Sequence, residues 1–242
     1  MIVYVRYGTR LSGKVDSFAG SYIATRFFHI YYVPLIPMSS WLVLKDGSGI
    51  SVPLNLRSVM AGWLRGVGTI AAVVAICVAM SSMGMHSRFD EEPSLLDWIL
   101  PTLLIGGSLW GWLALGRLSR RAKAERVIYY DSLGHFGDPA RLGDARSALI
   151  EKLRKDVQSR AQALAGIGYR ESYDPETAWR RVAAKPSTTD LPFLKAALTL
   201  ARLEWSFASG EHQKQLARDH ALIFENIERA HPDAVKIAGY GP

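Results

Sequence analysis

The chain has 242 residues, a formal net charge of +7 and a pI near 9.6, and its mean hydropathy of +0.06 averages one very apolar block with two ordinary flanks. Its single cysteine, Cys77, excludes a disulfide within the chain and a zinc site built from several cysteines. The length allows one or two modest domains beside a membrane segment. The basic residues gather beside the apolar block, which argues against nucleic acid as a partner.

Residues 1–54 are expected to form a small β-rich module. The β-branched and aromatic start of the chain predicts a first strand that breaks at residues 8–10. Asp46-Gly47-Ser48-Gly49 is a strong hairpin turn signal between strands at 39–45 and 50–54. We therefore expect about five short strands that make a small curled sheet or barrel.

An aromatic run ending in two prolines, residues 26–37, stands out in this module. It is too short and too interrupted by proline to cross a bilayer. We favour a buried strand that ends in a rigid corner at Pro34 and Pro37, with His29 as a strand residue that has one satisfied ring nitrogen. The alternative is a contact with lipid or a partner, made by Phe27, Phe28, Tyr31 and Tyr32.

Thr25, followed by this run and by the turn Pro34-Leu35-Ile36-Pro37, resembles a segment of small bacterial zinc-ribbon-like membrane proteins. The resemblance is confined to this segment. The paired metal-binding cysteines of that family are missing here, so zinc binding does not carry over, and the resemblance implies no cofactor or activity.

The chain is organised around residues 66–116, two apolar segments at 66–87 and 95–116 joined by the net negative loop 88–94. A helix needs about 20 predominantly apolar residues to cross a bilayer core of about 30 Å. Each segment meets that length, so we predict a two-helix transmembrane hairpin. It carries no ionisable residue at mid-membrane depth, which counts against a transporter or pump.

Residues 55–65 precede the hairpin and have apolar residues at helical spacing. We expect a separate amphipathic helix at the membrane surface, whose apolar face consists of Leu56, Val59, Met60, Trp63 and Leu64. The alternative is that the first transmembrane helix starts earlier.

Basic residues flank the hairpin on both sides, so the positive-inside rule places both termini in the cytoplasm and the loop outside. We expect a multi-pass protein of the cell inner membrane whose first span is an uncleaved insertion signal. Gly107 and Gly111 are expected to pack helices together, either within the hairpin or against another subunit. The residues expected at the membrane interface are Trp63, Arg65, Trp98, Trp110, Trp112, Arg117, Arg120 and Arg121.

After the hairpin we expect a basic juxtamembrane linker over 117–137, with a strand at 127–130, and a helical domain over 138–242. Helix starts are predicted at Asp138, Asp174, Asp190 and Glu211 because a capping residue, proline or acidic residue precedes apolar residues at helical spacing. The fold class is therefore a membrane α+β protein with a cytoplasmic helical bundle.

No phosphate-binding loop, nucleophile elbow or metal-ligand pattern occurs in the sequence, so we assign no catalytic, cofactor or metal residues and do not expect an enzyme. The function expected is that of an anchoring, assembly or accessory subunit acting through protein–protein contacts. Its expected partners are membrane lipids and other membrane subunits or a second copy of the chain. The alternatives are a membrane-surface sensor or enzyme with a site between the cytoplasmic modules, and a lipid-interacting protein.

Overall fold

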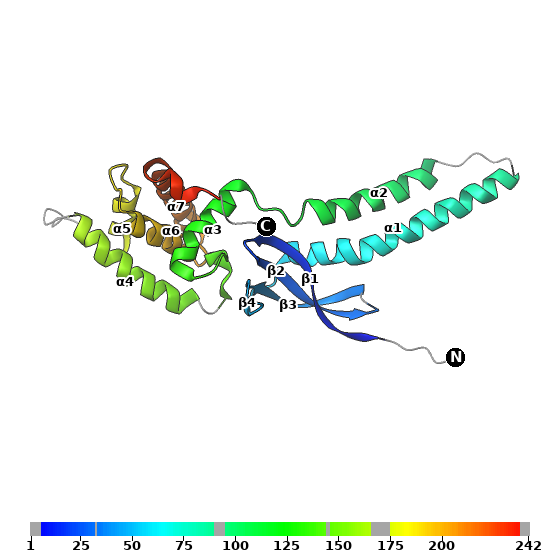
Figure 1. The fold of residues 1–242 in the computed structure, drawn as a ribbon, viewed down its shortest axis with the longest axis horizontal. Coiled ribbons are helices and arrows are strands. Elements are labelled where there is room, and N and C mark those ends of the chain that lie inside the picture. The colour runs from blue at the N-terminus through cyan, green and yellow to red at the C-terminus, as the bar shows by residue number, and fades with distance from the viewer. Residues whose placement is uncertain (1–5, 32, 90–94, 144–145, 166–174, 238–242) are drawn as a thin grey trace. The chain divides into compact units, whose positions relative to one another are not determined.

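A computed structural model describes residues 6–31, 33–89, 95–143, 146–165 and 175–237. The chain forms two compact units, divided chiefly between Arg117 and Leu118. The first unit contains a sheet and two long helices, and the second is a helical bundle (Figure 1).

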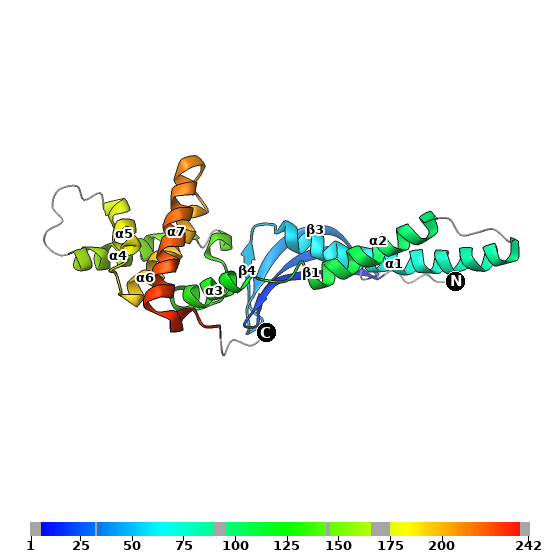
Figure 2. The same ribbon diagram turned by 90° about the horizontal axis from the view of Figure 1, so that it is seen from above.

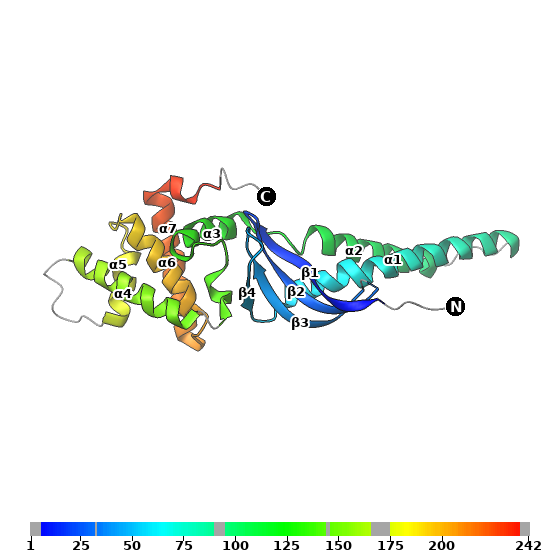
Figure 3. The ribbon, with the colours of Figure 1, turned by 60° about the horizontal axis from the view of Figure 1, so that its bottom comes forward.

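The first unit begins with a four-stranded antiparallel sheet whose spatial order follows the sequence (Figure 3). The β-rich module is thus confirmed, but the break expected at residues 8–10 was wrong because the first strand runs through them. The hairpin at the end of the sheet is confirmed: Gly47 adopts a positive φ of 84°, and the Ser48 N–H donates to Asp46 Oδ1 at 2.9 Å. The strands are β1 (Tyr7–Phe18), β2 (Ser21–Ile30), β3 (Val33–Val43) and β4 (Gly49–Val52).

The proline corner was also wrong, since Pro34 and Pro37 lie inside β3. Pro37 pairs with Phe27 and Pro34 with His29, and the register shifts beside each of these pairs. Proline has no N–H to give to a sheet ladder, and local bulges are where a strand tolerates it. The aromatic run therefore turns back as a hairpin, with its prolines on the returning strand.

Helix α1 (Leu56–Phe89) follows the sheet as one continuous helix of 34 residues. The separate helix at 55–65 was therefore wrong, and the alternative of an earlier helix start is the one observed. Its first turns bury Ser58 and Ala61 completely, while Leu56 and Met60 are 72% and 49% exposed. The large apolar side chains thus point away from the sheet, and small ones point towards it.

A buried chain of hydrogen bonds joins α1 to the sheet. Ser58 Oγ donates to the Gly13 carbonyl at 2.7 Å, and Thr25 Oγ1 donates to Ser58 Oγ at 2.9 Å. Because the Thr25 proton is used there, the Ser40 hydroxyl, 2.8 Å away, donates to Thr25. Ser40 in turn accepts the N–H of Asn55 at 3.0 Å. The hydroxyls of Thr25, Ser40 and Ser58 therefore all have hydrogen-bond partners, and this network fixes α1 on the sheet.

Glycines allow this close approach. Gly13 has a φ of +71°, and a Cβ there would overlap the backbone carbonyl of Ser58. A Cβ at Gly62 would lie 2.7 Å from the Phe27 ring, and one at Gly66 would overlap the Pro34 ring. The contact requires small residues, which explains why α1 turns its bulky face outward.

Helix α2 (Leu95–Leu113) runs alongside α1 (Figure 1). Among the residues that the structure describes, one stretch, Leu56–Cys77 of α1, is long and apolar enough to cross a membrane, with a hydropathy of 1.7 and 22% of its window buried. Two spans, at 66–87 and 95–116, were expected. The described part of the chain provides one candidate span, and it starts ten residues earlier than expected because α1 does.

The second unit packs its helices into one bundle (Figure 2). The linker expected at 117–137, with its strand at 127–130, was wrong: this segment holds a helix whose Ile128 and Tyr129 are buried in the bundle core. The β-branched pair Val127-Ile128 suggested a strand, but packing in the bundle outweighs that preference. The helices are α3 (Arg120–Leu133), α4 (Arg146–Ala165), α5 (Pro175–Ala184), α6 (Leu191–Trp205) and α7 (Gly210–Ala230), with short 3₁₀ turns η1 (Pro139–Arg141) and η3 (Pro232–Val235).

Helix starts in the bundle follow the capping residues closely. Asp190 accepts the N–H of Phe193 at 2.7 Å, and Asp138 accepts that of Ala140 at 3.0 Å. The helix expected from Asp138 is interrupted, however, because Asp138 caps only the short turn η1 and α4 begins at Arg146. Helix α6 lies at the centre, with Leu194, Leu198 and other side chains of its apolar face fully buried.

Candidate functional site

The foot of the α1–α2 pair gathers several of the expected interface residues. The Arg65 guanidinium lies 5.6 Å from the centre of the Trp112 ring, and Arg65 Nη1 donates to the Lys14 carbonyl at 2.6 Å. Trp112 Nε1 donates to Thr69 Oγ1 at 3.4 Å, and Thr69 shares a 3.0 Å hydrogen bond with Ser108. These contacts bring α1 and α2 together at the level where α1 leaves the sheet.

Large apolar side chains surround this foot on the outside. Trp63 is 41% exposed while its Nε1 donates to the Leu35 carbonyl at 3.2 Å, and Trp110 is also exposed. Tryptophan and arginine at one level are typical of a membrane–water interface. The exposed apolar residues near and beyond it are Leu35, Ile36 and Met38 on β3, Val67, Ile70, Val73, Val74 and Ile76 on α1, and Leu103 and Leu109 on α2.

Gly107 does not mediate the contact between the two helices. A Cβ at Gly107 would meet open space among the described residues, whereas one at Gly68 would touch Ser108 Cβ at 4.0 Å. Ser108 makes the contact instead, through its hydrogen bond with Thr69. The side chain of Trp98 and the surroundings of Gly111 lie outside the described residues.

The aromatic run divides between the interior and the surface. Phe27 is fully buried against α1, so the alternative of a lipid or partner contact is wrong for this residue, and the favoured buried strand is confirmed. Phe28 is half-buried and Tyr31 is exposed, while Tyr32 lies outside the described residues. His29 Nδ1 lies 2.7 Å from the Gly8 carbonyl and donates to it, as expected of a strand histidine with one satisfied nitrogen.

The arginines expected at the interface after the hairpin have different surroundings. Arg117 is exposed at the end of the first unit. Arg120 begins α3, and Arg121 pairs with Glu125 at 3.2 Å and stacks its guanidinium 5.0 Å from the Phe224 ring. The contacts of Arg121 therefore belong to the helical bundle.

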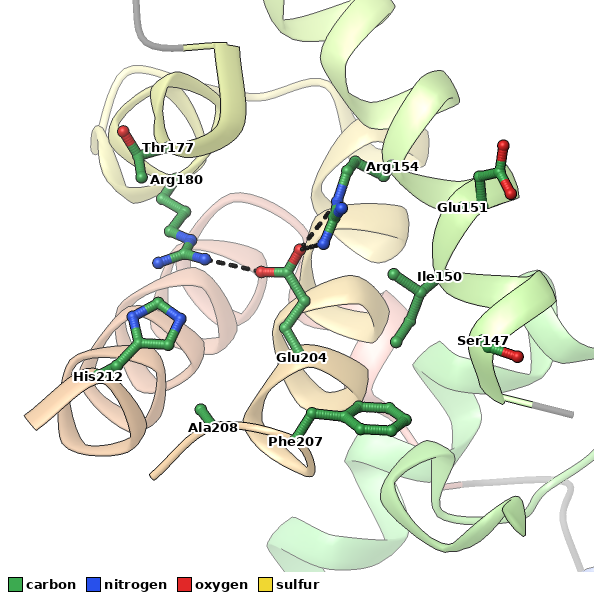
Figure 4. A pocket seen from close by; sticks show the side chains of 10 residues that line it. All are labelled: Ser147, Ile150, Glu151, Arg154, Thr177, Arg180, Glu204, Phe207, Ala208 and His212. Atoms are coloured by element: carbon green, nitrogen blue, oxygen red, sulfur yellow. Dashed lines mark hydrogen bonds and ion pairs between the residues drawn. The ribbon is translucent and has the colours of Figure 1, made fainter. Parts of the chain in front are cut away.

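The second unit contains a pocket of about 580 Å³ between α4, α5, α6 and the start of α7 (Figure 4). Glu204 of α6 points between two arginines: Arg154 Nη2 of α4 donates to its Oε1 at 2.9 Å, and Arg180 Nη2 of α5 donates to its Oε2 at 2.7 Å. Glu204 is buried, and the Arg180 side chain is only 11% exposed. The carboxylate thus holds three helices together around the pocket.

Other groups complete the lining of this pocket. His212 and Thr177 lie on the Arg180 side, Phe207 lies below the carboxylate, and Ile150 lies on the side of α4 (Figure 4). Phe207 is 59% exposed, with the Arg146 guanidinium 4.5 Å from its ring centre. The pocket therefore combines two guanidinium groups with an apolar wall.

Sequence reasoning missed this pocket. Glu204 interrupts an otherwise apolar face of α6, which continues from Ala197 and Ala201 at helical spacing. A carboxylate on a buried face requires a cationic partner, so the sequence alone could have indicated that Glu204 is paired. The sequence could not identify the partners, because Arg154 and Arg180 lie on other helices, 50 and 24 residues before Glu204.

A second polar cluster lies inside the bundle. The Tyr129 hydroxyl and His220 Nε2 are 2.8 Å apart, and burial, together with nearby Arg202 and Arg121, lowers the pKa of His220 to about 4. Burial also raises the pKa of Tyr129 well above its ordinary value. At neutral pH, Tyr129 therefore donates and the neutral imidazole accepts.

A carboxylate near this cluster, Asp138, is fixed by an arginine. Burial by itself would raise the pKa of Asp138, but the hydrogen bonds and charge of Arg202, at 2.8 and 3.0 Å, hold it below its ordinary value. His135, two residues after the end of α3, accepts the N–H of Gly137 at 3.1 Å. Both arrangements stabilise the bundle.

No family model, curated protein or solved structure matches this chain. The resemblance of the aromatic run to zinc-ribbon-like membrane proteins remains an expectation. Within the described ranges, no group of three His, Cys, Asp or Glu side chains is placed to hold a metal ion.

Proposed function

We propose that this protein is a two-span subunit of the inner membrane, with α1 and α2 crossing the bilayer as a hairpin. The observation that carries this proposal is the interface at the foot of the hairpin, where Arg65 stacks near Trp112, with Val67, Ile70 and Val73 exposed just beyond it. Exposed apolar side chains on a long helix are stable in lipid and costly in water.

The proposed orientation has both termini in the cytoplasm. Basic residues precede α1 and follow α2, whereas residues 88–94 are net negative. A short loop of this charge is the one expected to cross the membrane during insertion. The sheet and the helical bundle are then both cytoplasmic.

Its proposed role is anchoring or assembly through protein–protein contacts. The open face at Gly107 would suit the backbone of a neighbouring helix, either from another membrane subunit or from a second copy of the chain. The bundle adds a separate surface with the pocket around Glu204. Two contact surfaces, one in the membrane and one outside it, support an accessory subunit.

Reporter fusions and co-purification test the proposal. A reporter fused after Pro242 should be active only in its cytoplasmic form, and one inserted between Arg88 and Glu92 only in its external form. Purification from native membranes in mild detergent should yield a stoichiometric complex. The opposite reporter pattern would refute the orientation, two reporters on the same side would refute the hairpin, and a lone monomer would refute the assembly role.

A further inference from the structure

The start of β3 lies at the level where α1 leaves the sheet. A Cβ at Gly66 of α1 would overlap the Pro34 ring, and Trp63 Nε1 donates to the Leu35 carbonyl at 3.2 Å. Arg65, which directly precedes Gly66, carries the guanidinium at the foot of the α1–α2 pair. This end of the sheet is therefore at the same depth as the proposed membrane interface.

This part of β3 presents apolar side chains at an edge of the sheet. Strand β4 pairs only with residues 40–43 of β3, so residues 33–39 have β2 on one side and no strand on the other among the described residues. Leu35, Ile36 and Met38 are all exposed there, Ile36 by 61%. Leu35 has no partner in the register with β2, and this bulge breaks the alternation so that two consecutive side chains face outward.

A further strand is a poor occupant of this edge. Pro34 and Pro37 have no N–H to give to a ladder, and the Leu35 carbonyl already accepts from Trp63. An open sheet edge is not stable in the hydrocarbon core either. In the headgroup layer, however, water satisfies the backbone while apolar side chains reach the acyl boundary.

Basic residues lie at the same end of the sheet. A pocket of about 230 Å³ is lined by residues 6–10 and by His29, with two arginines, Arg6 and Arg10, and no acidic side chain in its lining. His29 connects this pocket to the β3 edge, because its Nδ1 donates to the Gly8 carbonyl of β1 and the same residue pairs with Pro34 of β3. The pocket and the apolar edge are therefore about two strand spacings, or about 10 Å, apart.

The acidic residues of the sheet lie elsewhere. Residues 6–52 contain two of them, Asp16 and Asp46. Asp16 pairs at 3.5 Å with Arg57, which is about 14 Å before Gly66 along α1. Asp46 accepts the Ser48 N–H in the turn between β3 and β4, at the other end of the sheet. The end beside Gly66 is thus both basic and apolar, a combination that suits an anionic membrane surface.

We propose that this end of the sheet docks on the cytoplasmic face of the bilayer and binds anionic phospholipid. Leu35 and Ile36 reach the acyl boundary, and Arg6 and Arg10 contact headgroup phosphates. A free phosphate ion would leave the apolar side chains in water, whereas a phospholipid covers both features. This inference rests on the proposed membrane span and adds a second contact with the same bilayer.

Quenching of a fluorophore on β3 tests the docking. The full chain with Cys77→Ala and Ile36→Cys is labelled with NBD and reconstituted into vesicles of phosphatidylcholine and phosphatidylglycerol. A nitroxide on the upper acyl chain should quench this label, and iodide on both sides of the vesicle should not. Ser48→Cys in the same background, at the exposed turn between β3 and β4, is the matched control and should show the reverse.

Lipid selectivity tests the arginines. Exchanging nitroxide-labelled phosphatidylcholine for nitroxide-labelled phosphatidylglycerol gives the relative binding constant of the anionic lipid beside the Ile36 label. We expect a preference of at least about fivefold, the contribution of one basic residue near an anionic surface. Arg6→Gln together with Arg10→Gln should remove this preference, whereas Lys45→Gln, a basic residue at the other end of the sheet, should leave it unchanged.

Two results would overturn the inference: iodide quenching of the Ile36 label as strong as that of the Ser48 label, or a lipid preference that the double arginine substitution does not change. NBD on Cys77 of the parent chain reports on α1 separately. If lipid quenches the Cys77 label but not the Ile36 label, the docking falls and the span stands. If lipid quenches neither label, the proposed span falls as well.

Discussion

Glu204→Gln should destabilise the second unit strongly although it changes only the charge of one side chain. The substitution keeps the shape of Glu204 but leaves two guanidinium groups facing a neutral amide. Arg154 is 40% exposed and can be hydrated, whereas Arg180 is 11% exposed and cannot. Removing one partner of a buried ion pair costs about 3–5 kcal/mol, and we expect the lower part of this range because only Arg180 is enclosed.

Urea unfolding of the full chain in mild detergent, followed by tryptophan fluorescence, measures this loss. Trp179 is fully buried and lies 5.4 Å from the Arg180 guanidinium, so its emission reports on this site. Glu151→Gln, at an exposed pair, is the control and should leave the midpoint unchanged. A loss below about 1 kcal/mol in Glu204→Gln, the level of an exposed ion pair, would refute the reasoning.

A triple replacement separates the loss of one ionic partner from the loss of the whole ion cluster. Arg154→Met, Arg180→Met and Glu204→Leu together remove the charges and keep similar volumes. Hydrophobic replacement of a complete buried ion cluster is often neutral or stabilising. The triple variant should therefore unfold at a urea concentration close to that of the parent chain, whereas a loss as large as that of Glu204→Gln would contradict this account of the ion cluster.

Three further predictions concern other parts of the chain. Gly13→Ala should prevent normal packing of α1 on the sheet, because its Cβ would overlap the Ser58 carbonyl at a positive φ; near-wild-type thermal stability of this variant would contradict the close approach. Asp190→Ala should cost about 1 kcal/mol in unfolding free energy by removing the cap on the Phe193 N–H, and an unchanged urea midpoint would argue against that cap. His220 is protonated near its ordinary pKa of 6.5 in the unfolded chain and only near a pKa of about 4 in the folded chain. The contribution of neutral His220 to the free energy of unfolding is therefore complete above pH 6.5 and is lost as the pH falls towards 4. The total loss is at most about 3 kcal/mol. His220→Gln should flatten this pH dependence of the urea midpoint, and a slope unchanged by the substitution would refute the assignment.

Local signals in the sequence predicted much of the secondary structure. The hairpin turn at Asp46 and the helix start at Asp190 depend on side chains that bond to backbone groups a few residues away, so a short window contains their cause. The two long helices were also evident from their composition. These features require no knowledge of tertiary contacts.

The missed features depend on contacts between distant residues. The apolar residues at the start of α1 predicted a face at the membrane surface but did not indicate that the other face packs on the sheet. There Gly13 and Gly62 admit only small side chains, so Ser58 faces the sheet and Met60 faces outward. Likewise, the pocket exists because Glu204 meets arginines of two other helices. Neither the contact of α1 with the sheet nor the ion pairs of Glu204 produce a periodic pattern in the sequence.

Reactivity of Cys77 in native membranes tests the central claim, that α1 crosses the bilayer, most directly. The first turns of α1 pack on the sheet, so the proposed bilayer core begins after the interface at Arg65. Cys77 is exposed on α1 and lies about 18 Å beyond Arg65 at 1.5 Å per residue, near the middle of a core of about 30 Å. In inside-out vesicles, a water-soluble maleimide should leave Cys77 unlabelled until SDS is added. Under the same conditions it should label a cysteine placed at the exposed Ser209 in a Cys77→Ala background. Equal labelling of both cysteines in intact vesicles would contradict the account.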